Sequence, residues 1–183
     1  MNRRSTCAGF CLSMLCVLML GTWPGALWAA DPCGGFTWDV AREQALFAGK
    51  AHQAVAGANG DTAPLLATGR LYELTLTPQE QVHFAVTPAK KALSDGANGG
   101  LIRFRVGSPG AYRFSLDLPF WIDMVADGQL VPSKDFQGRP GCSAPHKIVE
   151  FVLPSGKDLL LQFSNGVSRT VRVTITPSAP GKS

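Results

Sequence analysis

The sequence predicts an all-β fold, an antiparallel β-sandwich of jelly-roll-like form with a short N-terminal helix. From residue 71 onward, apolar residues alternate with polar ones at a period of two, which is the pattern of half-buried strands. Proline, glycine, asparagine and aspartate separate these short runs, and no helical pattern of similar length interrupts them. Short strands spaced by turns in this way are typical of a sandwich or jelly roll.

The first thirty residues have the features of a secretory signal peptide. An arginine pair at 3–4 is followed by an apolar run over 8–20 and by two small residues at 29–30. We therefore expect cleavage after 1–30 and a periplasmic or secreted protein with no membrane span. A retained anchor is the less favoured alternative, because glycine and proline at 21–25 interrupt the apolar run before the roughly 20 residues that a span needs.

The segment that follows is predicted to fold as a helix and then a flexible connection. Asp39 can cap a helix from Val40 to about Phe47, although 36–40 could instead form an edge strand. Residues 48–68 are rich in alanine, glycine and polar residues without periodicity, which indicates a mobile connection. The helix and connection together occupy 31–70.

Residues 71–177 are predicted to form the sandwich, and 178–183 a disordered tail. Asp127-Gly128 lies between two apolar runs and predicts a hairpin turn, because both residues tolerate a positive φ. Each alternating run is expected to bury one face and expose the other, so that Arg113, for example, faces solvent. The expected strands lie within 71–77, 82–86, 102–106, 112–116, 120–126, 129–131, 149–153, 159–163 and 171–175.

Charge and cysteine content constrain the partners and the compartment. Of the 17 basic residues two precede residue 31, which leaves 15 against 13 acidic ones, and this near-neutral balance argues against nucleic acid as a partner. Only Cys33 and Cys142 of the five cysteines lie beyond the signal peptide. In an oxidising compartment we expect them to pair and to close a loop of 109 residues, which would attach the N-terminus to the domain.

The sequence contains few residues suited to catalysis or metal binding. It has no G-x-S-x-G, G-x-G-x-x-G or phosphate-loop motif, and its three histidines are far apart. His146 and Glu150 share a strand face and are the best metal candidates, but a solvated surface pair is favoured over a metal site. His83 is expected at the surface. We therefore predict no metal and no other cofactor.

Two places could bind a ligand. Trp121 and Asp123 share one face of an apolar strand, where they could stack on and hydrogen-bond a sugar, although a core position for the tryptophan is favoured. The connection over 133–145 is long and polar, and such loops are often functional. Its candidate binding residues are Lys134, Asp135 and Arg139.

Two resemblances concern the fold and the function. The segment 110–116, Trp121-Ile122-Asp123 and the Asp127-Gly128 turn are similar in pattern to bacterial pre-peptidase C-terminal domains. These are non-catalytic jelly-roll modules implicated in substrate binding or secretion. The likeness extends over about 72–176 and implies a binding role rather than catalysis.

A resemblance over nearly the whole mature chain is carried by Cys33 with Phe36-x-Trp38-Asp39-Val40, by 79–82, by 121–128 and by 138–147. These segments resemble a family of small exported proteobacterial proteins of unknown function, members of which carry the name homogentisate 1,2-dioxygenase. That activity would need an iron held by two histidines and a glutamate. The expected function is therefore a non-catalytic, exported binding or envelope-associated protein whose partner is a small molecule, a glycan or an envelope protein, and a metal-dependent oxygenase is the alternative.

Overall fold

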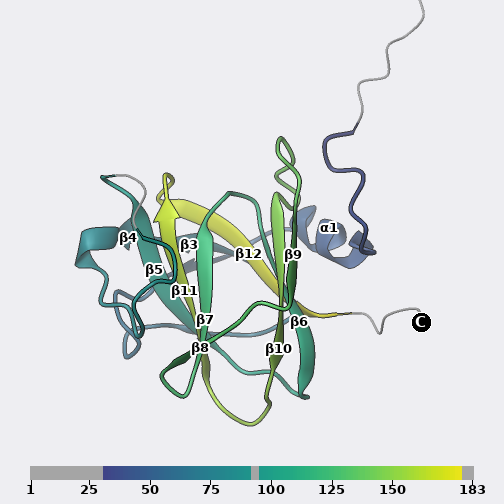
Figure 1. Cartoon of the computed structure of the whole chain (residues 1–183). Helices are drawn as coiled ribbons and strands as arrows, with labels where there is room; N and C mark the ends of the chain where they lie inside the picture. Colours follow the sequence, from purple (N-terminus) through teal and green to yellow (C-terminus); the bar gives the residue numbers. More distant parts are fainter. Residues whose placement is uncertain (1–30, 92–94, 179–183) are drawn as a thin grey trace, which may run out of the picture.

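The computed structural model describes residues 31–91 and 95–178, which form two packed β-sheets and two short helices (Figure 1). The predicted signal peptide, 1–30, and the end of the predicted tail, 179–183, lie outside the described residues. Within the described part, no helix is long and apolar enough to cross a membrane. The predicted all-β sandwich with a short N-terminal helix is confirmed.

Each sheet has six strands. The first has the order β1-β3-β12-β6-β10-β9; the second has the order β2-β5-β11-β7-β8, and β4 pairs with β5 beside that path. The first sheet comprises β1 His52–Val55, β3 Leu71–Thr75, β6 Gly110–Leu116, β9 Asp135–Gly138, β10 Lys147–Leu153 and β12 Thr170–Pro177. The second comprises β2 Leu65–Leu66, β4 Thr77–Pro78, β5 Asn98–Phe104, β7 Trp121–Ala126, β8 Gln129–Val131 and β11 Leu159–Gly166.

The core lies between the two sheets and is built from the alternating apolar positions. Phe104 of β5 packs edge-on against Phe114 of β6, which packs in the same way against Phe151 of β10. All three rings are buried. Burial of one such side chain contributes about 1.5–3 kcal/mol, so these strands are held mainly by their inward faces.

The strand pairing departs from the prediction in two ways. β1 pairs with β3, and β2 with β5, in parallel, so the sheets are mixed rather than purely antiparallel. The sheet order also does not form a clear jelly roll. Both parallel pairs arise because the segment 48–68, predicted as a mobile connection, instead supplies β1 and β2. The sandwich therefore begins before residue 71.

The alternating run 82–86 was also predicted as a strand, and this is wrong. The 3-10 helix η1 (Gln79–Gln81) precedes it, and the run itself has no regular structure. Its backbone is bound by other groups: the amide of His83 donates to the carbonyl of Ala58, and Gln162 both donates to and accepts from the backbone of Val86. His83 is exposed, as expected.

The N-terminal helix α1 spans Ala41–Phe47. It begins one residue later than predicted, and its N-cap is Val40, with no side-chain cap; Asp39 instead accepts a hydrogen bond from the amide of Ala41. The alternative edge strand at 36–40 does not form. The predicted disulfide between Cys33 and Cys142 is present and joins this segment to the sandwich.

Two further connections can be compared with the sequence. Asp127 and Gly128 both have positive φ, of 51° and 73°, and they join β7 to β8 as the predicted hairpin. The connection 133–145 is not wholly a loop, because it contains β9, which pairs with β10 along one edge of the first sheet. Ser178, assigned to the disordered tail, is described and donates a hydrogen bond to buried Glu150.

Candidate functional site

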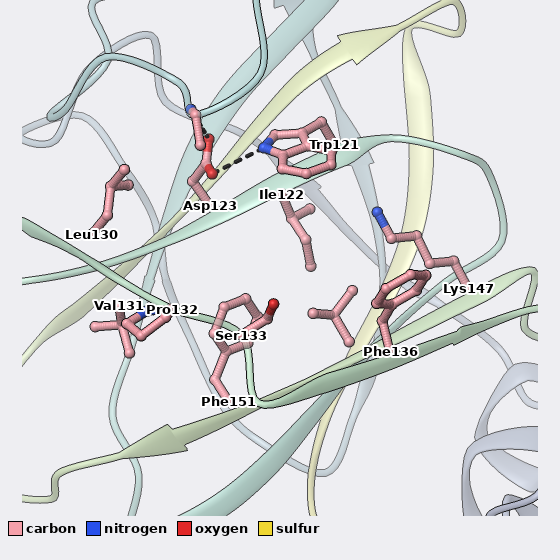
Figure 2. Close-up of a pocket in the computed structure, with 12 residues that line it drawn as sticks. Trp121, Ile122, Asp123, Leu130, Val131, Pro132, Ser133, Phe136, Lys147 and Phe151 are labelled. Carbon is pink, nitrogen blue, oxygen red and sulfur yellow. Dashed lines mark hydrogen bonds between the residues drawn. The ribbon is translucent and has the colours of Figure 1, made fainter.

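A cavity of about 500 Å³ lies between the two sheets at the edge where β7 and β8 face β9 and β10 (Figure 2). It opens there because β8 pairs only with the end of β7, at residues 124–126, so that among the described strands the first half of β7 has no neighbour on that side. The connection from β8 to β9, with Pro132 and Ser133, crosses from one sheet to the other and lines the cavity. Its volume falls within the range of about 300–1,000 Å³ that is usual for small-molecule sites.

The walls of the cavity are largely apolar. Val149 and Phe151 of β10 face inward and form its buried wall. Phe136 of β9 is in register with Val149, so both side chains project from the same face of the sheet. Phe136 remains 67% exposed, and Leu130 of β8, at the other rim, is 39% exposed. Two large apolar side chains at the rim of a concave, apolar space are typical of a binding site rather than of a closed core.

Lys147 is the cation of this cavity. It is the first residue of β10, two positions before Val149, so it lies in phase with the inward-facing residues. Its ammonium donates a hydrogen bond to the carbonyl of Phe120 at 3.0 Å and lies 5.3 Å from the centre of the Trp121 ring. Burial, together with the nearby charge of Lys90, lowers the pKa of Lys147 below its usual 10.5, although the charge of Asp123 opposes this.

Trp121 is half-buried, in contact with two lysines, rather than in the core. The ammonium of Lys90 also lies over its ring, at 5.4 Å from the centre. The indole N–H donates to one carboxylate oxygen of Asp123 at 2.9 Å, and the amide of Ala89 donates to the other at 3.2 Å. Both oxygens of this buried carboxylate therefore have protein donors, and its main effect is to fix the orientation of the indole.

The other predicted binding residues do not join this cavity. Lys134 forms an ion pair with Glu150 at 2.8 Å. The carboxylate of Asp135 accepts a hydrogen bond from the amide of the next residue, and Arg139 stacks over the ring of Phe36 near the disulfide. Of the five candidate binding residues, the structure brings together only Trp121 and Asp123.

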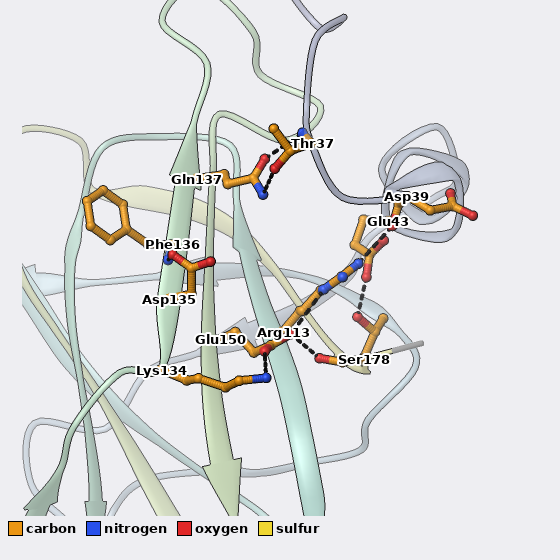
Figure 3. Close-up of polar contacts among 11 residues, drawn as sticks. Thr37, Asp39, Glu43, Arg113, Lys134, Asp135, Phe136, Gln137, Glu150 and Ser178 are labelled. Atoms are coloured by element: carbon orange, nitrogen blue, oxygen red, sulfur yellow. Dashed lines mark hydrogen bonds and ion pairs between the residues drawn. The ribbon is translucent and has the colours of Figure 1, made fainter. Parts of the chain in front are cut away.

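Glu150 belongs to a second cluster, on the outer face of the first sheet (Figure 3). Glu150 and its cross-strand partner Arg113 are 5% and 7% exposed, respectively, and their side chains form an ion pair at 3.4 Å. Arg113 also stacks on Trp38 at 4.6 Å and donates to the carbonyl of Asp39 at 2.7 Å. The N-terminal segment thus covers this face, which is why the predicted solvent exposure of Arg113 is wrong.

The electrostatics of Glu150 follow from these contacts. Burial alone would raise the pKa of this carboxyl group. Hydrogen bonds from Lys134 and Ser178, with the positive charges of Lys134 and Arg113, outweigh burial and hold the pKa of Glu150 below its usual 4.5. Glu150 is therefore an ionised structural group, and the expected solvated pair with His146 does not form. Over residues 31–91 and 95–178, no cluster of three or more potential metal ligands is found.

Sequence reasoning missed most of the cavity. Lys147, Val149 and Phe151 alternate along β10, and a lysine in phase with two core positions is the signal that could have revealed the cation. Phe136 carried a weaker signal as a lone aromatic residue in a polar connection. Leu130 could not have been assigned to the rim, because its exposure depends on the shortness of β8.

Comparisons with known proteins identify no relatives that bear on the site. No model of a known protein family matches the chain, and no curated protein matches it. Among solved structures, β-glucosidase from Kluyveromyces marxianus in complex with glucose aligns with 46% of this chain at 11% identity and a TM-score of 0.32; its selenomethionine form aligns with 58% at 12% identity and a TM-score of 0.31. The chain spans 10% and 13% of those proteins, and likeness at this level carries no argument about function.

Proposed function

We propose that this chain is an exported, non-catalytic binding protein that holds a small apolar ligand in the cleft between its two sheets. The observation that carries the proposal is the cavity of about 500 Å³ with largely apolar walls, open at the rim formed by Leu130 and Phe136. A solvent-accessible apolar surface of this shape is stabilised when an apolar molecule displaces its water. Export to a periplasmic or secreted location is supported by the N-terminal sequence pattern and by the disulfide.

The chemistry of the cleft favours a small apolar molecule over the other partners open from the sequence. The ammonium groups of Lys90 and Lys147 already lie over the Trp121 ring and would compete with a sugar for stacking on it. Each carboxylate oxygen of Asp123 already accepts a hydrogen bond from the protein, which leaves fewer lone pairs for sugar hydroxyl groups. Glycans need convergent polar groups, whereas most of the side chains at this site are apolar.

The proposal is tested by titrating the purified protein with N-phenyl-1-naphthylamine, a neutral dye that fluoresces in apolar surroundings. We expect saturable binding by the unsubstituted protein. Leu130→Trp adds a bulky side chain at the rim and is expected to weaken dye binding by about tenfold or more, because the ring occupies space that the dye needs. Val167→Trp is the matched control, since Val167 is 83% exposed and lies outside the cleft. Absence of saturable binding, or equal binding by all three proteins, would contradict the proposal.

A further inference from the structure

The cleft contains a positive charge that forms no ion pair with a carboxylate of the described residues. Lys147 donates one hydrogen bond, to the carbonyl of Phe120, and forms no ion pair with any described residue. Asp123 is the carboxylate that lines the cavity, and both its oxygens are directed to Trp121 and Ala89 instead. Lys90 adds a second positive charge over the same indole ring. The polar end of the cavity is therefore lined by one cation and one anion, and the second cation, Lys90, lies beside it over the indole ring.

The two ends of the cavity differ in chemistry. Val149 and Phe151 continue from Lys147 along the same inward face of β10. Apolar surface therefore extends away from the ammonium group, towards Phe151 (Figure 2). A cation at the border of an apolar cavity loses part of its hydration, which costs free energy. A charge-assisted hydrogen bond to an anion placed there would compensate for that cost. Lys147 still has donors for such a bond, because an ammonium group carries three.

We propose that the ligand is an anionic amphiphile, with an apolar body that lies against Val149, Phe151 and Phe136 and a single anionic head group that binds the ammonium of Lys147. This inference rests on the proposed function and names the ligand class of the same cleft. Lys90, which is exposed and lies over the Trp121 ring, adds a second positive charge near the head group. The carboxylate of Asp123 disfavours a second negative charge on the ligand.

The test compares three straight-chain probes with nearly the same apolar body: decanoate, decanol and decyltrimethylammonium. Their dissociation constants are measured by displacement of N-phenyl-1-naphthylamine at low ionic strength and below the micelle concentrations. We expect decanoate to bind about tenfold or more tightly than decanol, because a hydrogen bond between charged groups adds to the same apolar contact. The cationic probe is expected to bind most weakly.

Three variants locate the head group. Lys147→Met keeps an unbranched side chain of nearly the same length without the charge, and is expected to reduce decanoate affinity about tenfold, with decanol affinity unchanged. Lys90→Met, at an exposed position that does not risk the fold, is expected to reduce decanoate affinity severalfold, an effect that salt abolishes. Lys50→Met is the control, because Lys50 is exposed and does not line the cleft.

The outcomes separate this inference from the proposed function. If decanol binds as tightly as decanoate and Lys147→Met changes neither, the head-group inference is overturned while the apolar cleft stands. Preference for decyltrimethylammonium would overturn it as well. If the dye does not bind and no probe gives a signal by calorimetry, both the inference and the proposed function fail.

Discussion

Lys147 is a cation at a position of β10 where the alternating pattern predicts an apolar side chain. It precedes Val149 and Phe151 on the inward face of β10, where an unbranched apolar side chain such as methionine would fit without the charge. Its ammonium group nevertheless lies at this position, where it donates one hydrogen bond to the carbonyl of Phe120 and contacts the ring of Trp121. A charge held at this position at a cost in hydration is more typical of ligand recognition than of stability.

The first prediction concerns the pH dependence of binding through Lys147. Burial and Lys90 lower the pKa of Lys147, and Asp123 partly opposes them, so its ammonium loses its proton below the usual 10.5. Decanoate stays ionised over this range, so its affinity should fall as the pH rises from neutral towards 10.5. Isothermal titration calorimetry would measure this slope. Decanol, and decanoate with Lys147→Met, are the controls, and an equal slope in them would show that Lys147 is not responsible.

The second prediction concerns the stabilising role of Glu150. Because its folded-state pKa lies below 4.5, ionised Glu150 stabilises the fold above that pH, and this contribution is lost as the pH falls through the lowered pKa. Glu150→Gln leaves Arg113 buried without its anion and is expected to reduce the free energy of unfolding at pH 7 by about 3 kcal/mol. Urea unfolding at pH 7 and at about pH 3 would measure the difference, which should shrink in acid.

Asp158→Asn provides the matched comparison, because it removes a carboxylate that pairs with Arg105 in solvent. Exposed pairs contribute little, so this variant should unfold nearly as the unsubstituted protein does. A loss for Glu150→Gln no greater than that for Asp158→Asn would show that the buried cluster does not stabilise the fold.

Alternation along the chain predicted the inward-facing apolar positions better than it predicted the strands themselves. It did not predict the exposure of the opposite faces, where Ser115 and Thr174 are also buried. The run 82–86 has the expected faces, with Val82, Phe84 and Val86 half-buried, yet it forms no ladder because Gln162 and other groups bind its backbone. β1 was missed for the opposite reason, since an exposed edge strand with one neighbour needs no alternating pattern. The alternating pattern predicts which side chains are buried, whereas strand pairing depends on contacts between residues that are distant in the chain.

The candidate site was predicted only in part for the same reason. Trp121 and Asp123 could be placed on one face because they lie on one strand. Their position at a cleft depends on the short β8 and on β9, which belongs to the other sheet. Lys134 and Arg139 were grouped with them by sequence proximity to the same connection, but the strand β9 turns them towards Glu150 and Phe36.

The third prediction concerns the end of β11 where it supports β7. The register of β11 against β5 shifts between Phe163 and Gly166, and a Cβ added at Gly166 would overlap the ring of Phe120. Gly166→Ala is therefore expected to destabilise the protein by about 1–3 kcal/mol, the usual cost of overpacking a core. It should also weaken decanoate binding, because Phe120 holds Lys147.

Thermal unfolding and dye displacement would measure the two effects. Gly107→Ala is the control, because a Cβ there meets no atom within 4 Å and the backbone does not have a positive φ. If Gly166→Ala is as stable as Gly107→Ala, the packing of Phe120 against the end of β11 does not constrain this part of the cleft.

At the scale of the whole molecule, the N-terminal segment, residues 33–47, covers the outer face of the first sheet and is bound to the sandwich at several points. Glu43 of α1 accepts a buried hydrogen bond from Thr176 of β12. Thr37 and the side chain of Gln137 on β9 exchange two hydrogen bonds. Because Gln137 follows Phe136, the same cover reaches the strand that forms one rim of the cleft. The segment therefore links the closed outer face of the first sheet to the position of β9.

The last prediction concerns the disulfide that closes this arrangement. Cys33 and Cys142 are 109 residues apart, and a cross-link over such a loop removes conformational entropy from the unfolded chain worth about 4–5 kcal/mol. The double substitution Cys33→Ser, Cys142→Ser should lower the free energy of unfolding by about this amount, measured from the urea midpoint. Reduction of the unsubstituted protein should shift the midpoint equally and leave the double variant unchanged. An unchanged midpoint in the double variant would mean that the cover is held without the cross-link, by α1 and the contacts of Arg113 with Trp38 and Asp39.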